Sequence, residues 1–267
     1  MPGVAAVALG GSWARGEGDA LSDVDLGIYY EPPLSVTRLR ALAHRLVGRG
    51  RPAAVTAPGG WGPWIDGGGW LTIRGRRVDW IYRDLSRVGR VIADARRGRF
   101  SSHDQPGHPH GFHTHIYAGE VHDARILHDP RGVLAALQRR TRPYPAALAR
   151  SVRRSFLWRA DFALESSVKP AKRADVFHVS GSLFHSAACL LQILFAANGR
   201  YLINEKGALS AAEGLPLRPR RFSRRVRAIL ARPGGDARAL ARSLERMSDL
   251  VREVEALTAG TSLPRRR

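Results

Sequence analysis

Residues 4–30 read VAAVALGGSWARGEGDALSDVDLGIYY, and the rest of the chain can be interpreted from this stretch. It opens with small and β-branched residues, Val4 to Leu9, and this run ends at two glycines. Such a run predicts a buried strand, although its periodicity is also consistent with a helical segment. Gly10 and Gly11 favour a tight turn whose backbone N–H groups can approach a ligand closely. Ser12 is expected to cap a short helix and to offer its hydroxyl to a phosphate oxygen.

Asp23 and Asp25 begin a second segment, residues 23–30. In it the apolar residues Val24, Leu26 and Ile28 occupy every second position. The alternation predicts a strand with one buried face. Residues two apart on a strand point to the same side, about 6.6 Å apart, so Asp23 and Asp25 should face one ligand together. Carboxylates bind hard cations such as Mg²⁺, which are commonly shared with substrate phosphates. Two such ions can stabilise both the attacking and the leaving oxygen of a displacement.

A hairpin supplies a third carboxylate. Residues 69–73 and 78–82 are rich in aromatic and β-branched side chains, and a glycine lies in the short link between them, which is a hairpin signal. Asp79 is the one acidic residue in these two runs. Burial of its carboxylate is costly unless a charged group pairs with it. A metal shared with the first two aspartates would meet it, and Asp79 would then be a metal ligand or the base for an incoming hydroxyl. An ion pair with an arginine of residues 74–77 is the alternative.

The order of these motifs resembles the DNA polymerase beta-like nucleotidyltransferase superfamily. The pattern Gly-Ser-x-Ala-x-Gly at 11–16, followed by Ser-Asp-x-Asp at 22–25, is similar to its small bacterial branch, which includes aminoglycoside nucleotidyltransferases and antitoxin-type minimal nucleotidyltransferases. The resemblance covers residues 4–83 well and is far less specific in the rest of the chain. Members usually have a helix before the first strand, whereas residues 1–3 alone precede it here. Either that helix is absent or the natural start lies upstream.

The resemblance implies roles for individual residues. The implied contacts to nucleotide phosphates are Gly11 and Ser12, and the implied metal-binding and catalytic carboxylates are Asp23, Asp25 and Asp79. The cationic candidates for nucleotide or acceptor binding are Arg15, Lys169 and Lys206, with Lys172 and Arg173 beside them. Surface charge is the alternative for each of these cations.

The implied activity is transfer of a nucleoside monophosphate from a nucleoside triphosphate, expected to be ATP, to a hydroxyl with release of pyrophosphate. Two Mg²⁺ ions are the expected cofactors. The expected acceptor is a small hydroxylated molecule of the aminoglycoside type, with tRNA or protein as the second class. The alternative is a regulator that keeps the fold and binds nucleotide or RNA without turnover. Three clustered carboxylates favour the enzyme, because a pure binder of anions gains little from them.

The remaining pattern predicts an α+β chain of two domains. Helices are expected over 36–47 and 85–97, and a strand over 51–57. After Asp129 and Pro130 the sequence predicts five helices, over 132–139, 145–167, 174–198, 219–231 and 236–257. We therefore expect a nucleotidyltransferase domain over 1–130, with a small mixed β-sheet and flanking helices, and an all-α, acceptor-binding helical bundle over 131–267.

The charge of the chain is strongly positive. It has 43 Lys and Arg residues against 23 Asp and Glu, for a formal net charge of +20. Such a charge attracts phosphates and strengthens binding to nucleic acid at low salt. The arginines form dispersed clusters at 139–142, 150–154, 218–225 and 265–267. No aromatic residues are interleaved with them in the manner of a base-stacking surface, so the sequence favours a small-molecule acceptor over RNA.

Cysteine content and hydropathy bear on the compartment. The single cysteine, Cys189, permits no disulfide within the chain and is expected to be inert packing. Residues 1–18 lack a basic start followed by an apolar region, so no signal peptide is indicated and a cytoplasmic location is expected. The longest apolar stretch, residues 176–197, contains two histidines and several serines. It is expected to be the central helix of a bundle, without a membrane span, and the oligomeric state is not indicated.

Six histidines crowd into residues 101–122: His103, His108, His110, His113, His115 and His122. Imidazole is a common zinc ligand, but the spacing lacks a cysteine pair and fits no familiar zinc finger. A zinc site, a contact to substrate or phosphate, and a plain loop near the active site remain the three interpretations. Glu120 in the same segment is a reserve candidate for the base that activates the acceptor.

Overall fold

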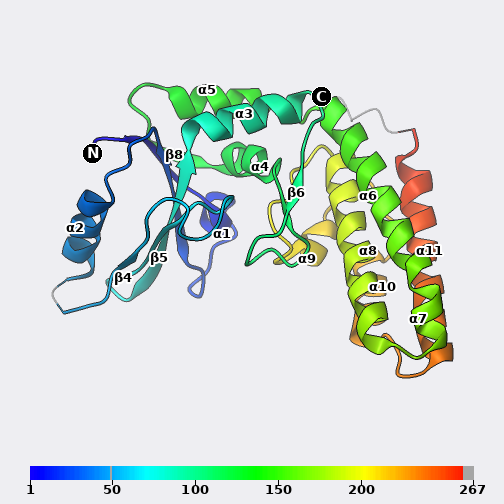
Figure 1. Cartoon of the computed structure of the whole chain (residues 1–267). Helices are drawn as coiled ribbons and strands as arrows, with labels where there is room; N and C mark the ends of the chain where they lie inside the picture. Colours follow the sequence, from blue (N-terminus) through cyan, green and yellow to red (C-terminus); the bar gives the residue numbers. More distant parts are fainter. Residues whose placement is uncertain (49, 261–267) are drawn as a thin grey trace. The chain divides into compact units, whose positions relative to one another are not determined.

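The computed structural model describes residues 1–48 and 50–260, which form two compact units (Figure 1). The first unit comprises residues 1–95 and 100–142, and the second comprises residues 96–99 and the chain from Pro143 onward. The first unit holds a six-stranded sheet, and the second is helical. The predicted α+β class is thereby confirmed. The arginine cluster at 265–267 lies outside the described residues.

The sheet of the first unit is mixed, as predicted. Its strand order is β3-β4-β5-β2-β1-β8. β2 and β5 pair in parallel, and the other neighbouring pairs are antiparallel. The strands are β1 (Val4–Leu9), β2 (Val24–Tyr30), β3 (Ala54–Val55), β4 (Gly68–Ile73), β5 (Arg76–Asp84) and β8 (Arg125–His128). The predicted hairpin is β4–β5, and the strand expected over 51–57 is reduced to the two residues of β3, which pair with Gly69 and Trp70.

Helices and a small ribbon complete the first unit. The helices are α1 (Gly11–Ala14), α2 (Val36–Val47), α3 (Leu85–Arg96), α4 (Ile116–Asp123) and α5 (Val133–Arg140), and the ribbon is β6 (Ser102–His103) with β7 (Phe112–His113). The segment with six histidines, which we considered as a loop, therefore contains two short strands and a helix. The helices predicted over 36–47 and 85–97 are α2 and α3.

One face of the sheet packs against α2. Leu39, Ala43 and Val47 of α2 join a buried cluster with the apolar side chains of β2, β4 and β5, among them Ile28 and Trp80. Val24 and Leu26 lie against the same cluster, as the alternation of β2 predicts. Since side chains alternate along a strand, the intervening residues of β2 and β5 point to the opposite face, which is where the aspartates lie.

A buried ion pair fastens α4 to that opposite face. The Arg83 side chain is 3% exposed, and its Nε and Nη2 each donate a hydrogen bond of 2.7 Å to the carboxylate of Glu120. The guanidinium also lies over the ring of Tyr117. Burial alone would lower the pKa of Arg83, but the Glu120 carboxylate holds that pKa above its ordinary value. Both Glu120 oxygens accept from Arg83, which argues against Glu120 as an acceptor-activating base.

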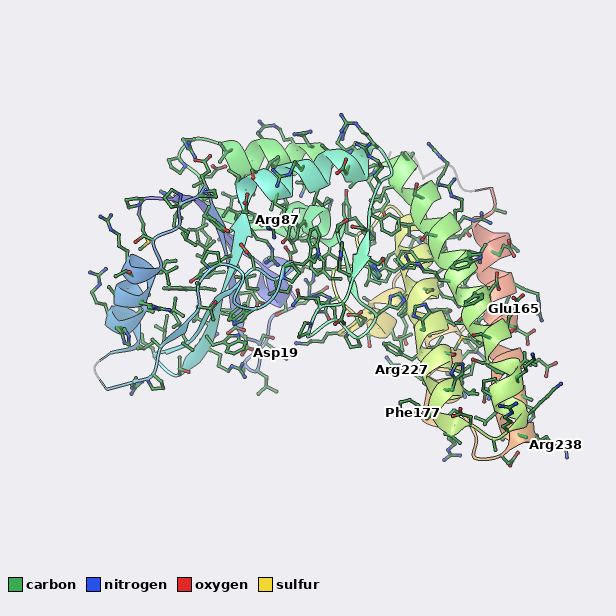
Figure 2. All side chains as sticks on the ribbon, in the orientation of Figure 1. Asp19, Arg87, Glu165, Phe177, Arg227 and Arg238 are labelled. Carbon is green, nitrogen blue, oxygen red and sulfur yellow. The ribbon has the colours of Figure 1, made fainter. Side chains whose placement is uncertain are left out.

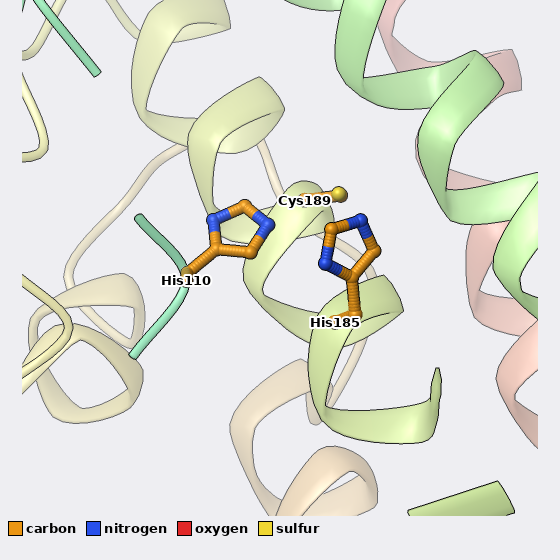
Figure 3. Close-up of side chains that lie close together, drawn as sticks. All are labelled: His110, His185 and Cys189. Atoms are coloured by element: carbon orange, nitrogen blue, oxygen red, sulfur yellow. The ribbon is translucent and has the colours of Figure 1, made fainter. Parts of the chain in front are cut away.

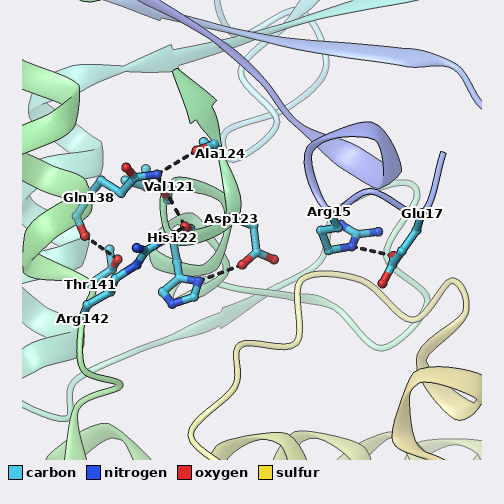
Figure 4. A network of polar contacts seen from close by, with 9 residues as sticks. All are labelled: Arg15, Glu17, Val121, His122, Asp123, Ala124, Gln138, Thr141 and Arg142. Carbon is cyan, nitrogen blue, oxygen red and sulfur yellow. Dashed lines mark hydrogen bonds and ion pairs between the residues drawn. The ribbon is translucent and has the colours of Figure 1, made fainter. Parts of the chain in front are cut away.

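Hydrogen bonds to the end of α4 hold it from the other side (Figure 4). Gln138 of α5 donates through Nε2 to the carbonyls of Val121 and Ala124, at 2.9 and 2.7 Å. Arg142 donates to the carbonyl of His122 at 3.0 Å. The last carbonyls of a helix lack partners within the helix, so these bonds satisfy them and fix α4 between the sheet and α5.

The Arg83–Glu120 pair gives a testable prediction of stability. In Arg83→Ala the Glu120 carboxylate loses its partner, and unfolding should become easier by about 3–5 kcal/mol, because a half-buried charge is left unpaired. The double variant Arg83→Leu/Glu120→Leu should recover part of this loss. Urea unfolding followed by circular dichroism measures both changes.

The exposed pair Arg131–Glu31 is the matched control, since its N–O distance is the same 2.7 Å but its side chains are 55% and 50% exposed. Arg131→Ala should cost about 1 kcal/mol or less. Equal losses in Arg83→Ala and Arg131→Ala would contradict the assigned role of the buried pair.

The second unit is a helical bundle around α8. Its helices are α6 (Ala146–Ser166), α7 (Val168–Lys172), α8 (Val176–Ala197), α9 (Ala208–Ala212), α10 (Phe222–Ala231) and α11 (Ala237–Thr258). The four long helices match the predicted ranges within a few residues. The short helices α7 and α9 were not predicted, because five residues are too few for a periodic pattern.

Among the described residues one helix, α8, is long and apolar enough to cross a membrane, with a mean hydropathy of 1.5 over its most apolar window. However, 72% of that window is buried inside the protein. Its neighbours in the bundle include α6, α10 and α11. This burial agrees with the prediction of a central bundle helix.

The thiol of Cys189 should be unreactive in the folded protein. Cys189 follows His185 by one turn of α8 (Figure 3), is fully buried, and burial raises its pKa to about 12. Because the thiolate is the nucleophile, iodoacetamide at mildly alkaline pH should label the native protein very slowly and the urea-unfolded protein at one site per chain. Labelling of the native protein as fast as the unfolded one would contradict this burial. Mass spectrometry measures the labelling.

Candidate active site

The parallel pairing of β2 with β5 brings two carboxylates together. In this register Asp25 lies opposite Asp79, with Val24 opposite Val78 and Leu26 opposite Trp80. Neighbouring strands are about 4.8 Å apart, and both aspartates point away from the face that α2 covers. Two of the three predicted carboxylates are therefore adjacent, and each is half-buried.

Asp23 lies just before β2 and is turned to Arg77. The distance from Asp23 Oδ1 to Arg77 Nε is 3.4 Å, in a partly exposed pair. Over residues 1–48 and 50–260, the carboxylate oxygens of Asp23, Asp25 and Asp79 do not all lie within 4.8 Å of one another. From the sequence, an arginine of residues 74–77 was an alternative partner for Asp79. In the structure Arg77 pairs with Asp23. Asp23 would have to leave Arg77 to share a metal with the other two.

The glycine turn packs directly on Asp25. The N–H of Gly10 donates to the Asp25 carbonyl at 2.8 Å, and β1 pairs with β2 up to Leu9 opposite Leu26. Gly11 has φ +60°, and a Cβ there would lie 1.8 Å from Asp25 Oδ2. Only glycine leaves room for the Asp25 carboxylate at this point. The turn and the carboxylate are therefore one packed unit.

The prediction that Ser12 caps α1 is wrong. Gly10, with an extended backbone, occupies the N-cap position, and Ser12 is the second residue of the helix. The Ser12 carbonyl accepts from the N–H groups of Arg15 and Glu17, at 3.2 and 2.9 Å. The expected contacts of the Ser12 hydroxyl and the Gly11 backbone with phosphate stay predictions.

The connection from α1 to β2 is held by Trp13, which sequence reasoning missed. Trp13 Nε1 donates to the Ser22 carbonyl at 3.3 Å. A Cβ at Gly18 would lie 2.4 Å from the indole, and the guanidinium of Arg76 is 5.6 Å from its centroid. The loop ends in a turn in which Asp19 Oδ1 accepts from the Leu21 N–H and the Ser22 hydroxyl. A tryptophan between a glycine turn and Gly18 was the available signal.

The cationic candidates are dispersed. Arg15 donates through Nε to Glu17 at 2.8 Å on the surface of the first unit (Figure 4). Lys169 is exposed on α7, and Lys206 precedes α9, where its N–H donates to Asn204 Oδ1 at 2.7 Å. Both lysines belong to the second unit, and their roles toward nucleotide stay predictions.

The histidine segment forms an aromatic cluster within the first unit. His113 shares hydrogen bonds through Nδ1 with the Ser102 hydroxyl at 2.9 Å and through Nε2 with His110 Nδ1 at 3.1 Å. The rings of His103 and Phe112 stack on Trp64, at 4.7 and 5.7 Å between centroids. The segment thus packs on the loop before β4. Zinc binding and substrate contact stay predictions.

One family model matches the part of the chain that carries the glycine turn and the first two aspartates. Residues 1–50 match the family model described as nucleotidyltransferase domain. The first 50 residues of the chain are therefore similar to nucleotidyltransferase domains. The matched range includes the glycine turn, Asp23 and Asp25, and it confirms the superfamily predicted from these motifs.

The crystal structure of a nucleotidyltransferase-like protein from Exiguobacterium sibiricum 255-15 is similar to this chain, with 13% sequence identity, 97% of this chain and 72% of that chain covered, and a TM-score of 0.47. The search of curated proteins gave no match.

A nucleotidyltransferase domain generally uses a nucleoside triphosphate and a divalent metal. The donor set fits such a metal, because Asp25 and Asp79 supply hard oxygen ligands from adjacent strands, and Mg²⁺ binds protein through one or two carboxylates plus substrate phosphates. The missing Cβ at Gly11 also leaves room for the Asp25 carboxylate beside the turn.

Gly11→Ala should displace the Asp25 carboxylate and lower nucleotidyl transfer strongly, because the new Cβ would collide with Oδ2. Gly16→Ala is the matched control: its φ is +73°, yet no atom lies within 4 Å of a Cβ there. Each alanine costs about 1 kcal/mol of backbone strain, and Gly11→Ala alone adds the collision. Thermal unfolding and activity measure the difference, and identical behaviour of the two variants would contradict the close packing at Gly11.

Proposed function

We propose that the protein transfers a nucleoside monophosphate from a nucleoside triphosphate, expected to be ATP, to a hydroxyl acceptor. The acceptor oxygen forms a bond to the α-phosphorus. The bond between the α-phosphorus and the oxygen that bridges it to the β-phosphate breaks, and pyrophosphate leaves. The observation that carries this proposal is the placement of Asp25 opposite Asp79, with the glycine turn packed on Asp25.

The three aspartates take the metal-binding roles in this proposal. Asp25 and Asp79 would hold Mg²⁺, and Asp23 would join when the triphosphate and metal compete with Arg77 for it. The metal would supply charge neutralisation and orientation of the phosphates. Asp79 would be a metal ligand or would accept the proton of the acceptor hydroxyl.

For the acceptor, we retain a small hydroxylated molecule as the first class and tRNA or protein as the second. The net charge of +20 adds one restriction. A strongly basic surface disfavours a polycation and favours neutral or anionic molecules. Among small hydroxylated acceptors, neutral or anionic ones are therefore preferred over aminoglycosides with several amino groups.

Asp25→Asn and Asp79→Asn should each lower transfer by about a hundredfold or more, because each removes a charge from the metal site, while the fold is retained. Asp19→Asn is the control, since Asp19 is exposed in the same connection and serves the turn. The measurement is transfer of α-labelled nucleoside triphosphates with Mg²⁺ into small hydroxylated molecules, bulk tRNA and cell protein. A chelator should abolish the signal.

Normal turnover in a folded Asp25→Asn variant would contradict the proposed function. A second result favours the non-catalytic regulator: triphosphate binding that does not respond to metal, with no transfer to any class of acceptor.

A further inference from the structure

A groove with exposed aromatic walls lies within the second unit, between α6 and α8. Its volume is about 1150 Å³. Trp158 and Phe162 of α6 are 65% and 56% exposed, and their rings are parallel within 12° with centroids 5.3 Å apart. Phe177 of α8 is 93% exposed (Figure 2). Exposed rings gathered in a groove mark a surface that binds something.

The lining also contains polar side chains, and none of them is negatively charged. Arg159, His178 and His185 line the groove, with the hydroxyls of Ser166, Ser180 and Ser182. None of the described residues lining it is acidic. These hydrogen-bonding groups can pair with the edges of a flat polar ring. They distinguish the groove from a purely aliphatic groove that binds a helix.

The surroundings of the groove are basic at one end. Lys169, Lys172 and Arg173 are exposed on and just after α7, the short helix that links α6 to α8. Asp161 and Glu165 also lie on α6 but do not line the groove. Burial and the carboxylates of Glu255 and Glu165 raise the pKa of Asp161. The charge of the groove and its basic end complements an anion.

We propose that this groove binds single-stranded nucleic acid, with bases stacked on Trp158, Phe162 and Phe177 and phosphates drawn to Arg159 and the lysines of α7. Aromatic side chains in a basic groove bind single strands in this way, because every base has a flat face. A second copy of the chain is disfavoured as the occupant, since two chains of charge +20 repel each other. The proposal goes beyond nucleotidyl transfer and requires neither metal nor the aspartates.

The three aromatic rings come from two helices and are brought together by the fold. No aromatic residues were found interleaved with the arginine clusters, yet Trp158 and Phe162 lie one helical turn apart and Phe177 joins them from another helix. The base-stacking surface exists only in three dimensions.

Gly181 offers a way to fill the groove without damaging the fold. It lines the groove in the second turn of α8, and a Cβ there would meet nothing within 4 Å. Leucine forms helix better than glycine, so Gly181→Leu should leave the bundle intact and obstruct the groove.

The test uses the intact protein, without nucleoside triphosphate or metal, and a short fluorescent single-stranded oligoadenylate. Trp158→Ala, Phe162→Ala, Phe177→Ala and Gly181→Leu should each weaken binding by about 5- to 100-fold, the range for loss of one stacked base. Asp25→Asn should bind normally, which separates this proposal from the proposed transfer activity. The charge and apolar controls on α11, Arg242→Gln and Leu257→Ala, should change binding by less than about twofold, because neither residue lines the groove.

Inorganic polyphosphate is the second probe, because it has charge but no bases. Polyphosphate should bind the aromatic variants as tightly as it binds the natural protein. The proposal is overturned if oligoadenylate does not bind, if the four groove variants bind it normally, or if they lose polyphosphate to the same extent. It is also overturned if size-exclusion chromatography with light scattering shows a dimer that Gly181→Leu abolishes, since the groove would then be an interface between copies.

Discussion

The parallel pairing of β2 with β5 is the contact on which the candidate site depends. A strand presents alternate side chains to opposite faces, so this register decides two things at once. It sends Val24 and Trp80 to the core under α2, and it places Asp25 opposite Asp79 on the other face. A slip of one residue would bury the carboxylates and expose the apolar side chains. The hydrophobic core therefore holds the register of Asp25 and Asp79, the carboxylates of the candidate site.

The opposite face of the sheet is divided along its strands. Toward the ends of β2 and β5 it is covered by α4, which the buried Arg83–Glu120 pair fastens in place. Toward their beginnings it carries Asp25 and Asp79 beside the glycine turn. The same pair of strands thus holds α4 at one end and carries the candidate metal-binding carboxylates at the other, so a buried arginine and half-buried aspartates share one face.

Short-range patterns predicted most of the secondary structure. They did not predict which residues far apart in the sequence contact one another. The alternation in β2 and the glycine between β4 and β5 were sufficient for the strands and the hairpin, because period and turn chemistry are local. The assignment of Ser12 as a cap failed, because Gly10 already adopts the extended backbone of that position. Glu120 was considered a base because it stands near histidines in sequence, whereas Arg83, from a different element, takes both of its oxygens.

By itself, the sequence determined strands β1, β2, β4 and β5, the long helices, the glycine turn and the three aspartates, since each depends on residues only a few positions apart. The tertiary structure alone decided which carboxylates meet: Asp25 faces Asp79, while Asp23 is held by Arg77. It also decided that Trp158, Phe162 and Phe177 form one surface. The physical reason is that strand register and helix packing are set by burial of the whole core, which no local pattern records.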